Sequence, residues 1–430
     1  MNTTDKILNL FYDTTGVCTD TRKIEKNCLF ICLKGDHFNG NTFALKALEQ
    51  GAKYVIIDEE EFKVADNIFV VDNSLLFLQD LAKYHRNKFS IPVIGITGSN
   101  GKTSTKELIR AVLSKKYNVL ATDGNLNNHI GVPLSLLKIT KEHDIAIIEM
   151  GANKYKDIEE LCAIATPNFG IITNIGKAHL EGFKNYEGVL KTKLELYTSI
   201  NKISGEIIIN GDDQTLLDNV PVNIKTFSYS QGQNSDIIGK LINLSPFVEM
   251  EWSTENYQSG LISTQMIGKY NFYNFLAAIA FGVRFGVSPQ EINAAISEYS
   301  PSNNRSQVKE KTRNTLILDC YNANPTSMQS ALESFAMINH PKKLFIIGDM
   351  LELGTESEQE HQNILNLATK LNLFGYVVGP IFSKIDENDF TYFASTSEAI
   401  DFFKKNTVSD SLILLKGSRG IGLENLENLF

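Results

Sequence analysis

Nine residues in the first quarter of the chain, Gly-Ile-Thr-Gly-Ser-Asn-Gly-Lys-Thr over 95–103, have the types and spacing needed to hold a polyphosphate. They follow a short apolar run and precede an amphipathic pattern that predicts a helix over 104–116. A glycine-rich turn between a strand and a helix directs backbone N–H groups at one point, beside the positive end of the helix dipole. Lys102 adds a charge for the outer phosphates, and the hydroxyl of Thr103 is placed to bind Mg²⁺. The segment predicts binding of a nucleoside triphosphate, although Ile96 stands where the strict phosphate-loop pattern has its first glycine. The residues expected at the nucleotide are Gly98, Ser99, Asn100, Gly101, Lys102, Thr103 and Ser104.

Two polar side chains follow predicted strands further along the chain. Glu149 ends an apolar run over 144–149, and His179 follows the next strand, in the segment 173–182. Ligands of open parallel sheets bind beyond the carboxyl ends of the strands. Glu149 is therefore expected to hold Mg²⁺ through oxygen, with an exposed turn carboxylate as the alternative. Imidazole is an unusual Mg²⁺ ligand, so the residues alone support His179 only by its shared position at a strand end.

Several asparagines could bind a polar ligand or could simply hold turns. Asn125, Asn127 and Asn128 occupy one loop, where amides serve either purpose. Asn271 and Asn274 are three residues apart, so they share one face of a helix and could present a donor and an acceptor to a base edge.

Four charged residues have equally open assignments. Lys191 and Lys193 open an amphipathic helix, where a solvated face is the ordinary interpretation. Arg305, in a predicted linker, could reach a phosphate, and Asp319 ends the first strand of the last predicted unit.

Composition excludes several classes of protein. The 430 residues are 43% hydrophobic and 21% charged, with a formal net charge of −9, so a general nucleic-acid binder is not expected. The five cysteines have no paired metal-ligand spacing and are predicted to be reduced core thiols. No apolar run approaches the ~20 residues that span a bilayer, and the N-terminus does not read as a signal peptide, so we expect a cytoplasmic protein without membrane insertion.

The order of predicted elements divides the chain into three α/β units. Residues 1 to about 88 contain short strand signals and one helix, and from about 89 to 210 apolar strands alternate with helical patterns, which is typical of a mostly parallel sheet with helices on its faces. Period-two alternation over 224–267 predicts antiparallel strands added to that sheet, and the turn-rich segment 300–304 predicts a linker. We therefore expect domains at 1–88, 89–304 and 305–430.

Taken together, these segments resemble the Mur ligase family, which forms amide bonds in bacterial cell-wall precursors. Thr97–Thr103 is similar to the family's phosphate loop, Glu149–Asn153 to its Mg²⁺-binding strand end, and Gly176–Phe183 to its histidine segment. The resemblance covers nearly the whole chain. It implies an α/β protein of three-domain Mur ligase architecture, with a small N-terminal α/β domain, a central P-loop-type mostly parallel sheet and a C-terminal Rossmann-like domain.

Further motifs resemble the branch of this family that adds D-alanyl-D-alanine to UDP-N-acetylmuramoyl-tripeptide. They are Gly124–Asn128 with Gly131–Pro133, Asp319–Pro325, and Gly348–Gly354. Asp20–Arg22 resembles part of the family's uridine-nucleotide domain, which usually has serine at the middle position. The resemblance implies an ATP-dependent amide ligase that works through an acyl phosphate and yields the pentapeptide precursor of peptidoglycan, ADP and phosphate.

The resemblance also implies metal and catalytic roles. One Mg²⁺ is expected on Thr103 and Glu149, and a second on His179 and on Lys193 as its carbamate. A carbamate turns a cation into an oxygen ligand, which suits Mg²⁺. The expected catalytic residues are Lys102, His179 and Lys193.

The remaining implied roles concern nucleotide and substrate. Asn271 and Asn274 would face adenine, Arg305 phosphate and Asp319 the ribose. Tyr270 replaces the family's histidine, and Asn304 stands where the family has a glycine. The expected substrate contacts are Thr21, Arg22, Asn125, Asn127, Asn128, Tyr321, Asn322 and Asn324.

The expected partners are UDP-N-acetylmuramoyl-tripeptide and D-alanyl-D-alanine, bound by a monomer that does not bind nucleic acid. Two alternatives stay open. One is another ATP-dependent amide ligase, either like folylpolyglutamate synthetase or from a different Mur branch. The other is a nucleotide-driven switch or motor, which would hydrolyse ATP without carboxylate and amine substrates.

Overall fold

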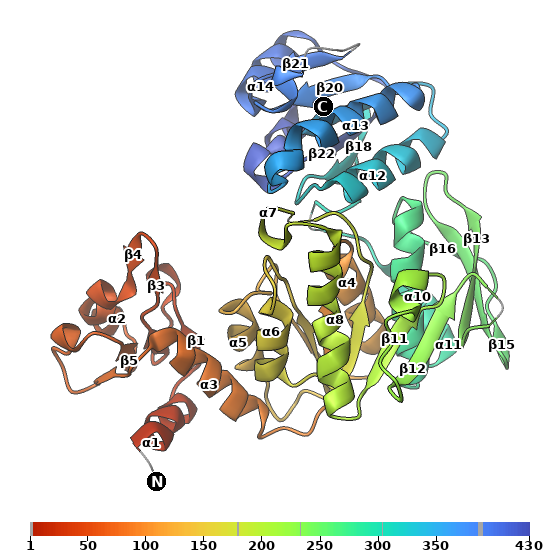
Figure 1. Cartoon of the computed structure of the whole chain (residues 1–430). Helices are drawn as coiled ribbons and strands as arrows, with labels where there is room; N and C mark the ends of the chain where they lie inside the picture. The colour runs from red at the N-terminus through yellow and green to blue at the C-terminus, as the bar shows by residue number, and fades with distance from the viewer. Residues whose placement is uncertain (1–2, 179, 233, 303, 386–389) are drawn as a thin grey trace. The chain divides into compact units, whose positions relative to one another are not determined.

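The computed structural model describes residues 3–178, 180–232, 234–302, 304–385 and 390–430. The described chain forms two compact units, each of which is an α/β body (Figure 1). The first unit runs to Gly95 and adds Tyr117–Gly151 and Asp157–Phe169, and the second consists of Ile96–Lys116, Ala152–Lys156 and Gly170–Phe430.

The N-terminal part of the first unit is a four-stranded parallel sheet with the order β1-β2-β5-β6. Its elements are α1 (Thr3–Leu10), η1 (Phe11–Asp13), β1 (Val17–Cys18), η2 (Thr21–Lys23), β2 (Leu29–Ile31), β3 (Lys34–Gly35), β4 (Phe38–Asn39), η3 (Gly40–Phe43), α2 (Ala44–Glu49), β5 (Tyr54–Ile57), η4 (Glu60–Phe62), β6 (Ile68–Val70) and α3 (Ser74–Arg86). The apolar residues of β2 and β5 pack against α2 in one buried core. Cys28 and Cys32 belong to this core, and all five cysteines of the chain are free thiols, as predicted.

Helix α3 joins this sheet to the rest of the first unit. It packs against α5 (Gly131–Leu136) and α6 (Asp157–Ala165), beside the parallel pair β8 (Val119–Ala121) and β9 (Ile145–Glu149). Two buried side chains near its end fix the contact: Arg86 Nε donates to the carbonyl of Ala165 at 3.2 Å, and His85 Nε2 lies 2.8 Å from the carbonyl oxygen of Ile139. The C-terminal end of α3 is therefore buried within the first unit.

The largest sheet has the strand order β15-β14-β13-β12-β11-β10-β7-β9-β8, with β16 also paired to β14. The elements not yet given are β7 (Val93–Thr97), α4 (Lys102–Leu113), β10 (Phe169–Ile172), α7 (Leu180–Phe183), α8 (Tyr186–Lys202), β11 (Glu206–Asn210), α9 (Gln214–Leu217), β12 (Lys225–Ser230), β13 (Ile237–Asn243), β14 (Glu249–Thr254), β15 (Tyr257–Gln258), β16 (Ile262–Ser263), α10 (Lys269–Arg284) and α11 (Pro289–Glu298). The predicted antiparallel strands are confirmed from β13 onward. For β12 the prediction is wrong, because this strand runs parallel to β11 over five residue pairs. Alternating apolar residues predict a strand but carry no information on its direction.

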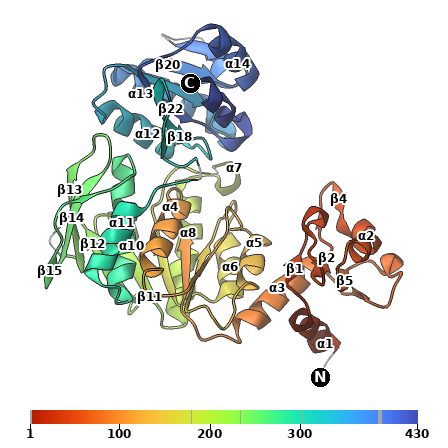
Figure 2. The same cartoon turned by 180° about the vertical axis from the view of Figure 1, so that it is seen from behind.

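Helices cover both faces of the part of this sheet that lies in the second unit. α4, α10 and α11 pack together on one face (Figure 2), and α8 lies against β11 on the other (Figure 1). Close approach on the first face depends on Gly282, because an added Cβ there would lie 2.6 Å from Val112 of α4. The predicted start of α11 is confirmed: Ser288 caps it in a reciprocal capping box with Glu291, and Pro289 is its first residue.

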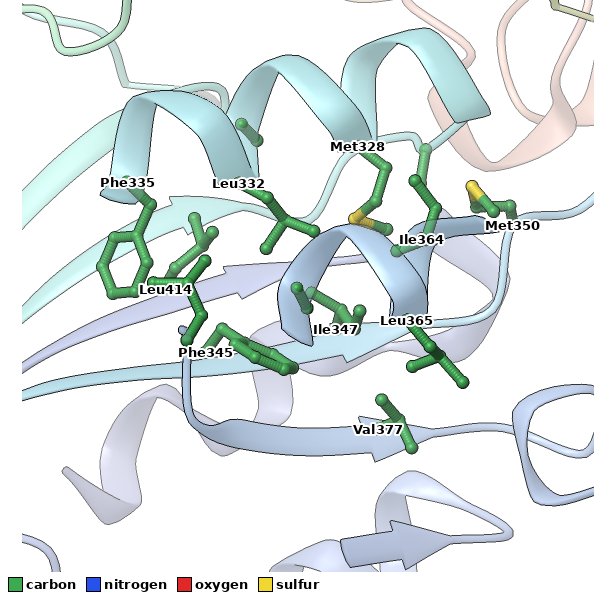
Figure 3. Close-up of a cluster of buried hydrophobic side chains, with 14 of the residues drawn as sticks. Met328, Leu332, Phe335, Phe345, Ile347, Met350, Ile364, Leu365, Val377 and Leu414 are labelled. Atoms are coloured by element: carbon green, nitrogen blue, oxygen red, sulfur yellow. The ribbon is translucent and has the colours of Figure 1, made fainter. Parts of the chain in front are cut away.

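The C-terminal part of the second unit is a six-stranded sheet with the order β17-β18-β22-β19-β20-β21. Its elements are β17 (Gln307–Glu310), β18 (Asn314–Asp319), α12 (Pro325–Met337), β19 (Lys343–Gly348), η5 (Gly354–Glu356), α13 (Ser357–Lys370), β20 (Gly375–Val378), η6 (Phe382–Lys384), β21 (Thr391–Phe393), α14 (Thr396–Lys405), β22 (Ser411–Lys416), η7 (Arg419–Ile421) and η8 (Leu423–Leu429). All strands run parallel except β17, an edge strand that the sequence analysis did not predict. Alternate residues of the strands face opposite sides, which gives one core under α12 and α13 and another under α14 and η8. Figure 3 shows the first of these cores, with Leu332 and Phe335 of α12 above Phe345, Ile347 and Leu414.

A buried polar pair lies at the end of β19. Both carboxylate oxygens of Asp349 accept backbone N–H groups, from Ile381 at 2.8 Å and from Phe382 at 3.0 Å. His361 is also fully buried; its Nε2 accepts the N–H of Met350 at 2.9 Å and its Nδ1 lies 2.6 Å from the carbonyl oxygen of Ser357. This arrangement requires a neutral imidazole with the proton on Nδ1. The Gly348–Gly354 motif thus holds loops of this sheet in place.

We predict that unfolding becomes easier between about pH 7.5 and about pH 5.5. Burial lowers the pKa of both His361 and His85 below the ordinary value, so the unfolded chain binds protons at a pH where the folded chain does not. The stabilisation from neutral imidazole is complete above the unfolded pKa of about 6.5 and is lost as the pH falls toward the folded pKa. Scanning calorimetry should show a midpoint lower by a few degrees at the acid end, and His361→Gln should reduce that difference. An equal or higher midpoint at the acid end would contradict this account.

Candidate active site

The glycine-rich turn has a backbone conformation that only glycine adopts without strain. Gly98 has φ +140° and Gly101 has φ +77°, both outside the usual range of L-residues. A Cβ at Gly98 would collide with the hydroxyl of Thr173, and one at Gly101 would lie 2.9 Å from Asn274 Oδ1. Gly101 is the N-cap of α4 and offers no capping side chain, so the start of this helix suits an external anion.

The segment after β10 holds this turn by several hydrogen bonds. The carbonyl and Oδ1 of Asn174 accept the N–H groups of Ser99 and Asn100 at 3.0 and 3.1 Å, and the Thr173 hydroxyl donates to the carbonyl of Asn100 at 2.6 Å. The hydroxyl of Ser99 also lies 2.9 Å from the N–H of Gly176. Neither Thr173 nor Asn174 was predicted to belong to the site, although both stand in the segment 173–182 that contains His179.

Lys102 and Thr103 occupy the first turn of α4, as the motif predicts. The ammonium of Lys102 donates to the carbonyls of Gly98 at 2.8 Å and Ser99 at 3.4 Å, so the side chain curls over the turn. Thr103 is buried and Ser104 is half-buried. A charge above a ring of backbone donors is the arrangement that binds outer phosphates.

Asn271 and Asn274 lie at the start of α10, buried and facing α4. Asn274 Nδ2 donates to Asn271 Oδ1 at 2.8 Å, and the Thr105 hydroxyl donates to Asn274 Oδ1 at 3.0 Å. Tyr270, at the position of the family's histidine, has its hydroxyl 2.7 Å from the hydroxyl of Ser306. The structure therefore brings the predicted adenine-side residues together with the phosphate-binding turn.

Arg305 stacks on Tyr321, with its guanidinium carbon 3.8 Å from the ring centroid. Its buried Nε has no hydrogen-bond partner in the described part of the chain. An unsatisfied buried donor is unfavourable, and an anion bound at this position would satisfy it. Asn304, where the family has glycine, has φ +51°, a region that asparagine tolerates better than most residues.

Asp319 lies at the carboxyl end of β18 in a partly buried ion pair that was not predicted from the sequence. Its Oδ2 lies 2.6 Å from the ammonium of Lys416, and its Oδ1 accepts the N–H of Ser306 at 3.2 Å. Lys416 is 97 residues away at the end of β22, so no local pattern could have indicated the pair.

The other predicted contacts of this region have backbone partners. Asn322 Oδ1 accepts the N–H of Ala323 at 2.9 Å. Asn324 caps α12 by accepting the N–H of Ser327 at 2.9 Å, and its Nδ2 donates to Asn100 Oδ1 at 2.7 Å. One residue thus joins a helix start to the phosphate-binding turn.

A cavity of about 550 Å³ lies between the segment around Lys177 and helices α12 and α13. Two of its lining residues form an ion pair, with Lys177 Nζ 2.6 Å from Glu360 Oε1, and this pair raises the pKa of Lys177. Lys177, two residues before His179 in the sequence, is therefore engaged with α13.

Lys193 is almost completely buried in α8, with 2% of its surface exposed. Its Nζ lies 5.5 Å from the centroid of the Phe183 ring. The sequence interpretation of a solvated face holds for Lys191, which is exposed and paired with Glu187, and is wrong for Lys193. His179 lies outside the described residues.

Glu149 and the asparagine loop belong to the first unit. Glu149 is 1% exposed, and its Oε1 accepts a hydrogen bond from Asn127 Nδ2 at 2.8 Å. Asn128 Oδ1 accepts the N–H groups of Ile130 and Gly131 at 3.1 and 2.9 Å, so this amide holds the turn. Asn125 is exposed.

At the predicted uridine-nucleotide segment, Arg22 forms a two-point ion pair with Asp20. Nε lies 2.9 Å from Oδ1, and Nη2 lies 2.8 Å from Oδ2. The guanidinium lowers the pKa of Asp20 to about 2. Thr21, between them, is half-buried.

Within the described residues, no three His, Cys, Asp or Glu side chains are grouped closely enough to hold a metal ion. A metal bound by one or two such side chains would need further ligands of another kind, such as hydroxyl groups, a modified lysine or phosphate oxygens.

The fold is that of the Mur ligases, and the chain belongs to that family. The Mur ligase family catalytic domain matches residues 13–86, the Mur ligase middle domain 96–282, and the Mur ligase glutamate ligase domain 304–419. The mostly parallel α/β architecture predicted from the sequence is confirmed. Members of the family are ATP-dependent amide ligases, so the chain is an enzyme of that class.

Among individual relatives, the chain is 34% identical to UDP-N-acetylmuramoyl-tripeptide–D-alanyl-D-alanine ligase of Bacillus subtilis, over 96% of this chain and 92% of that protein. It superposes on a crystal structure of MurF from Acinetobacter baumannii with a TM-score of 0.86 at 31% identity, covering 96% and 92% of the two chains. The MurF ligase of Thermotoga maritima, solved in complex with ADP, gives a TM-score of 0.87 at 26% identity and covers 98% of each chain. Across the described residues, no helix has both the length and the apolar character needed to cross a membrane.

We predict that Gly98→Ala weakens ADP binding by about 10-fold or more, because the new methyl group must displace Thr173 from the turn. Isothermal titration with ADP measures the effect. Gly260→Ala is the matched control, since Gly260 has open space around its Cβ position and no positive φ. Equal affinities of the two variants would show that the turn does not bind the nucleotide.

Proposed function

We propose that this protein joins D-alanyl-D-alanine to UDP-N-acetylmuramoyl-tripeptide at the expense of ATP, giving the pentapeptide precursor, ADP and phosphate. The observation that carries the proposal is the similarity to the ligase of that name in Bacillus subtilis, which extends over 96% of the chain. The phosphate-binding turn and its supports give this similarity a physical basis. A cytoplasmic location is part of the proposal, because that is where ATP is supplied.

The chemistry begins with a carboxylate, which is a poor acyl donor because its leaving group would be oxide. Transfer of the γ-phosphoryl group of ATP to the peptide's terminal carboxylate gives an acyl phosphate and ADP. The dipeptide amine then attacks the acyl carbon, the tetrahedral intermediate expels phosphate, and an amide remains. Lys102 and the backbone of the turn hold and neutralise the phosphates during the first step.

Mg²⁺ fits the donors that the chain offers. The Thr103 hydroxyl and the Glu149 carboxylate are buried oxygen donors, and the amide of Asn127 orients that carboxylate. When bound, the ion neutralises negative charge on the phosphates and the substrate carboxylate. We assign Thr103 and Glu149 to a first Mg²⁺ and carbamoylated Lys193 with His179 to a second.

The burial of Lys193 supports its modification. The side chain of Lys193 is almost completely buried, and a carbamate formed there is an oxygen-bearing anion that a divalent cation can bind. The modification is a reaction of the neutral amine with CO₂ that forms an N–C bond and releases a proton.

The three predicted domains divide the remaining tasks. Residues 1–88, with Thr21 and Arg22, would bind the uridine nucleotide, and 305–430, with Tyr321, Asn322 and Asn324, would bind the dipeptide. Asn125, Asn127 and Asn128 would border the peptide in the central domain, 89–304. Arg305 would contact phosphate, Asp319 the ribose, and Asn271 and Asn274 the adenine. The unsatisfied Nε of Arg305 supports its part.

We predict that ADP release requires both UDP-N-acetylmuramoyl-tripeptide and D-alanyl-D-alanine. Purified enzyme with ATP and Mg²⁺ is assayed complete and with each substrate omitted in turn, and the pentapeptide product is confirmed by mass. Release without either substrate, stimulated by a protein partner, would instead indicate a nucleotide-driven switch.

We also predict that Lys193→Ala lowers ligation by about 100-fold or more, and that a small carboxylate such as formate or acetate partly restores it. The added anion supplies the oxygen ligand that the carbamate would have provided. Lys191→Ala, which removes an exposed lysine two residues away, should retain activity near that of the unmodified enzyme. Full activity of Lys193→Ala would refute the second metal site.

A further inference from the structure

A buried chain of hydrogen bonds connects the first turn of α4 with the start of α10. The Thr105 hydroxyl donates to Asn274 Oδ1 at 3.0 Å, Asn274 Nδ2 donates to Asn271 Oδ1 at 2.8 Å, and Asn271 Nδ2 donates to the carbonyl of Ile267 at 2.7 Å. Thr105 has no exposed surface, and Asn271 and Asn274 are 1% and 7% exposed. These buried hydrogen bonds therefore all run in one direction, from the Thr105 hydroxyl to the backbone carbonyl of Ile267.

Asn274 touches the turn at two points. A Cβ on Gly101 would lie 2.9 Å from its Oδ1 and 3.4 Å from its Nδ2, so the amide lies directly against the last glycine before α4. Thr105, its hydrogen-bond partner, closes the first helical turn by donating its own N–H to the carbonyl of Gly101 at 2.8 Å. Asn274 thus contacts both ends of the turn that carries Lys102 and Thr103.

We infer that Thr105 and Asn274 are a positioning pair for the phosphate-binding turn, with Asn271 as their anchor. The inference rests on the proposed function in taking ATP as the ligand of the turn. It adds Thr105 to the site and gives Asn274 a role that does not involve the base. Donors that are already aligned before the ligand arrives bind it without a cost of reorganisation, so loosening α4 should weaken every phosphate ligand.

A ligand without a base separates this role from adenine recognition. In the positioning role, losing the Thr105 hydroxyl affects inorganic tripolyphosphate and ADP by the same factor. If Asn274 acts only on the base, replacing it lowers the affinity for ADP and leaves the affinity for tripolyphosphate unchanged. Replacing the completely buried Thr105 then changes neither affinity.

The test uses the full-length enzyme and the variants Thr105→Val, Thr105→Ser and Asn274→Ala. Thr105→Val keeps the shape and removes the hydroxyl, so the dissociation constants of both ligands should rise by about 2- to 12-fold, as for one lost hydrogen bond. Thr105→Ser should restore them. The KM for ATP should rise by the same factor, with kcat and the KM for the tripeptide substrate little changed. Asn274→Ala should weaken both ligands, and the double variant Thr105→Val/Asn274→Ala should be little weaker than Asn274→Ala alone.

Ser334→Ala is the control for loss of a buried hydroxyl, since the hydroxyl of Ser334 donates to the carbonyl of Ser330 in its own helix, at 2.7 Å. It should leave both affinities unchanged, and thermal unfolding of every variant shows that the protein folds. If Thr105→Val binds tripolyphosphate as tightly as the unmodified enzyme, or Asn274→Ala weakens only ADP, the inference is wrong. If the unmodified enzyme binds neither ligand, the proposed function fails instead.

Discussion

The packing of the glycine-rich turn against the segment that follows β10 is the interaction on which the rest of the site depends. A turn with two glycines at positive φ has little conformational preference of its own. Asn174 accepts hydrogen bonds from the N–H groups of Ser99 and Asn100, and Thr173 donates one to the carbonyl of Asn100. These bonds hold the backbone of the turn in a single conformation. The strand ends of a parallel sheet matter here because they hold the binding turn in shape as well as carrying ligand groups.

The features that were predicted correctly from the sequence are those determined by residues close together in the chain. The turn at 98–103 is recognisable from its own glycines and Lys102, and the start of α11 from Ser288, Pro289 and Glu291. The strand β12 was predicted, but its predicted antiparallel direction was wrong, because direction is set by the strand with which it pairs. The pair of Asp319 with Lys416 and the contact of Asn324 with Asn100 span 97 and 224 residues, and nothing local to either residue encodes them.

The asparagines show why residue type alone leaves a role open. An amide carries both a donor and an acceptor, so it can cap a helix, hold a turn and still face a ligand. Asn128 holds the turn before α5, and Asn127 orients Glu149. Lys193 is the opposite case: spacing indicated a solvated face, and only burial separates it from Lys191. For such residues the three-dimensional surroundings carry the information that the sequence lacks.

The side chain of Asn324 makes two hydrogen bonds that serve different purposes. Its Oδ1 caps the N-terminus of α12, and its Nδ2 donates a hydrogen bond to Asn100 Oδ1 in the phosphate-binding turn. Replacing Asn324 removes both hydrogen bonds at once, so one substitution will both lower the folding stability and alter catalysis. A defect at this position cannot be credited to recognition of the incoming dipeptide until the loss of the helix cap has been compensated, for instance by serine, which caps well but is too short to span to Asn100.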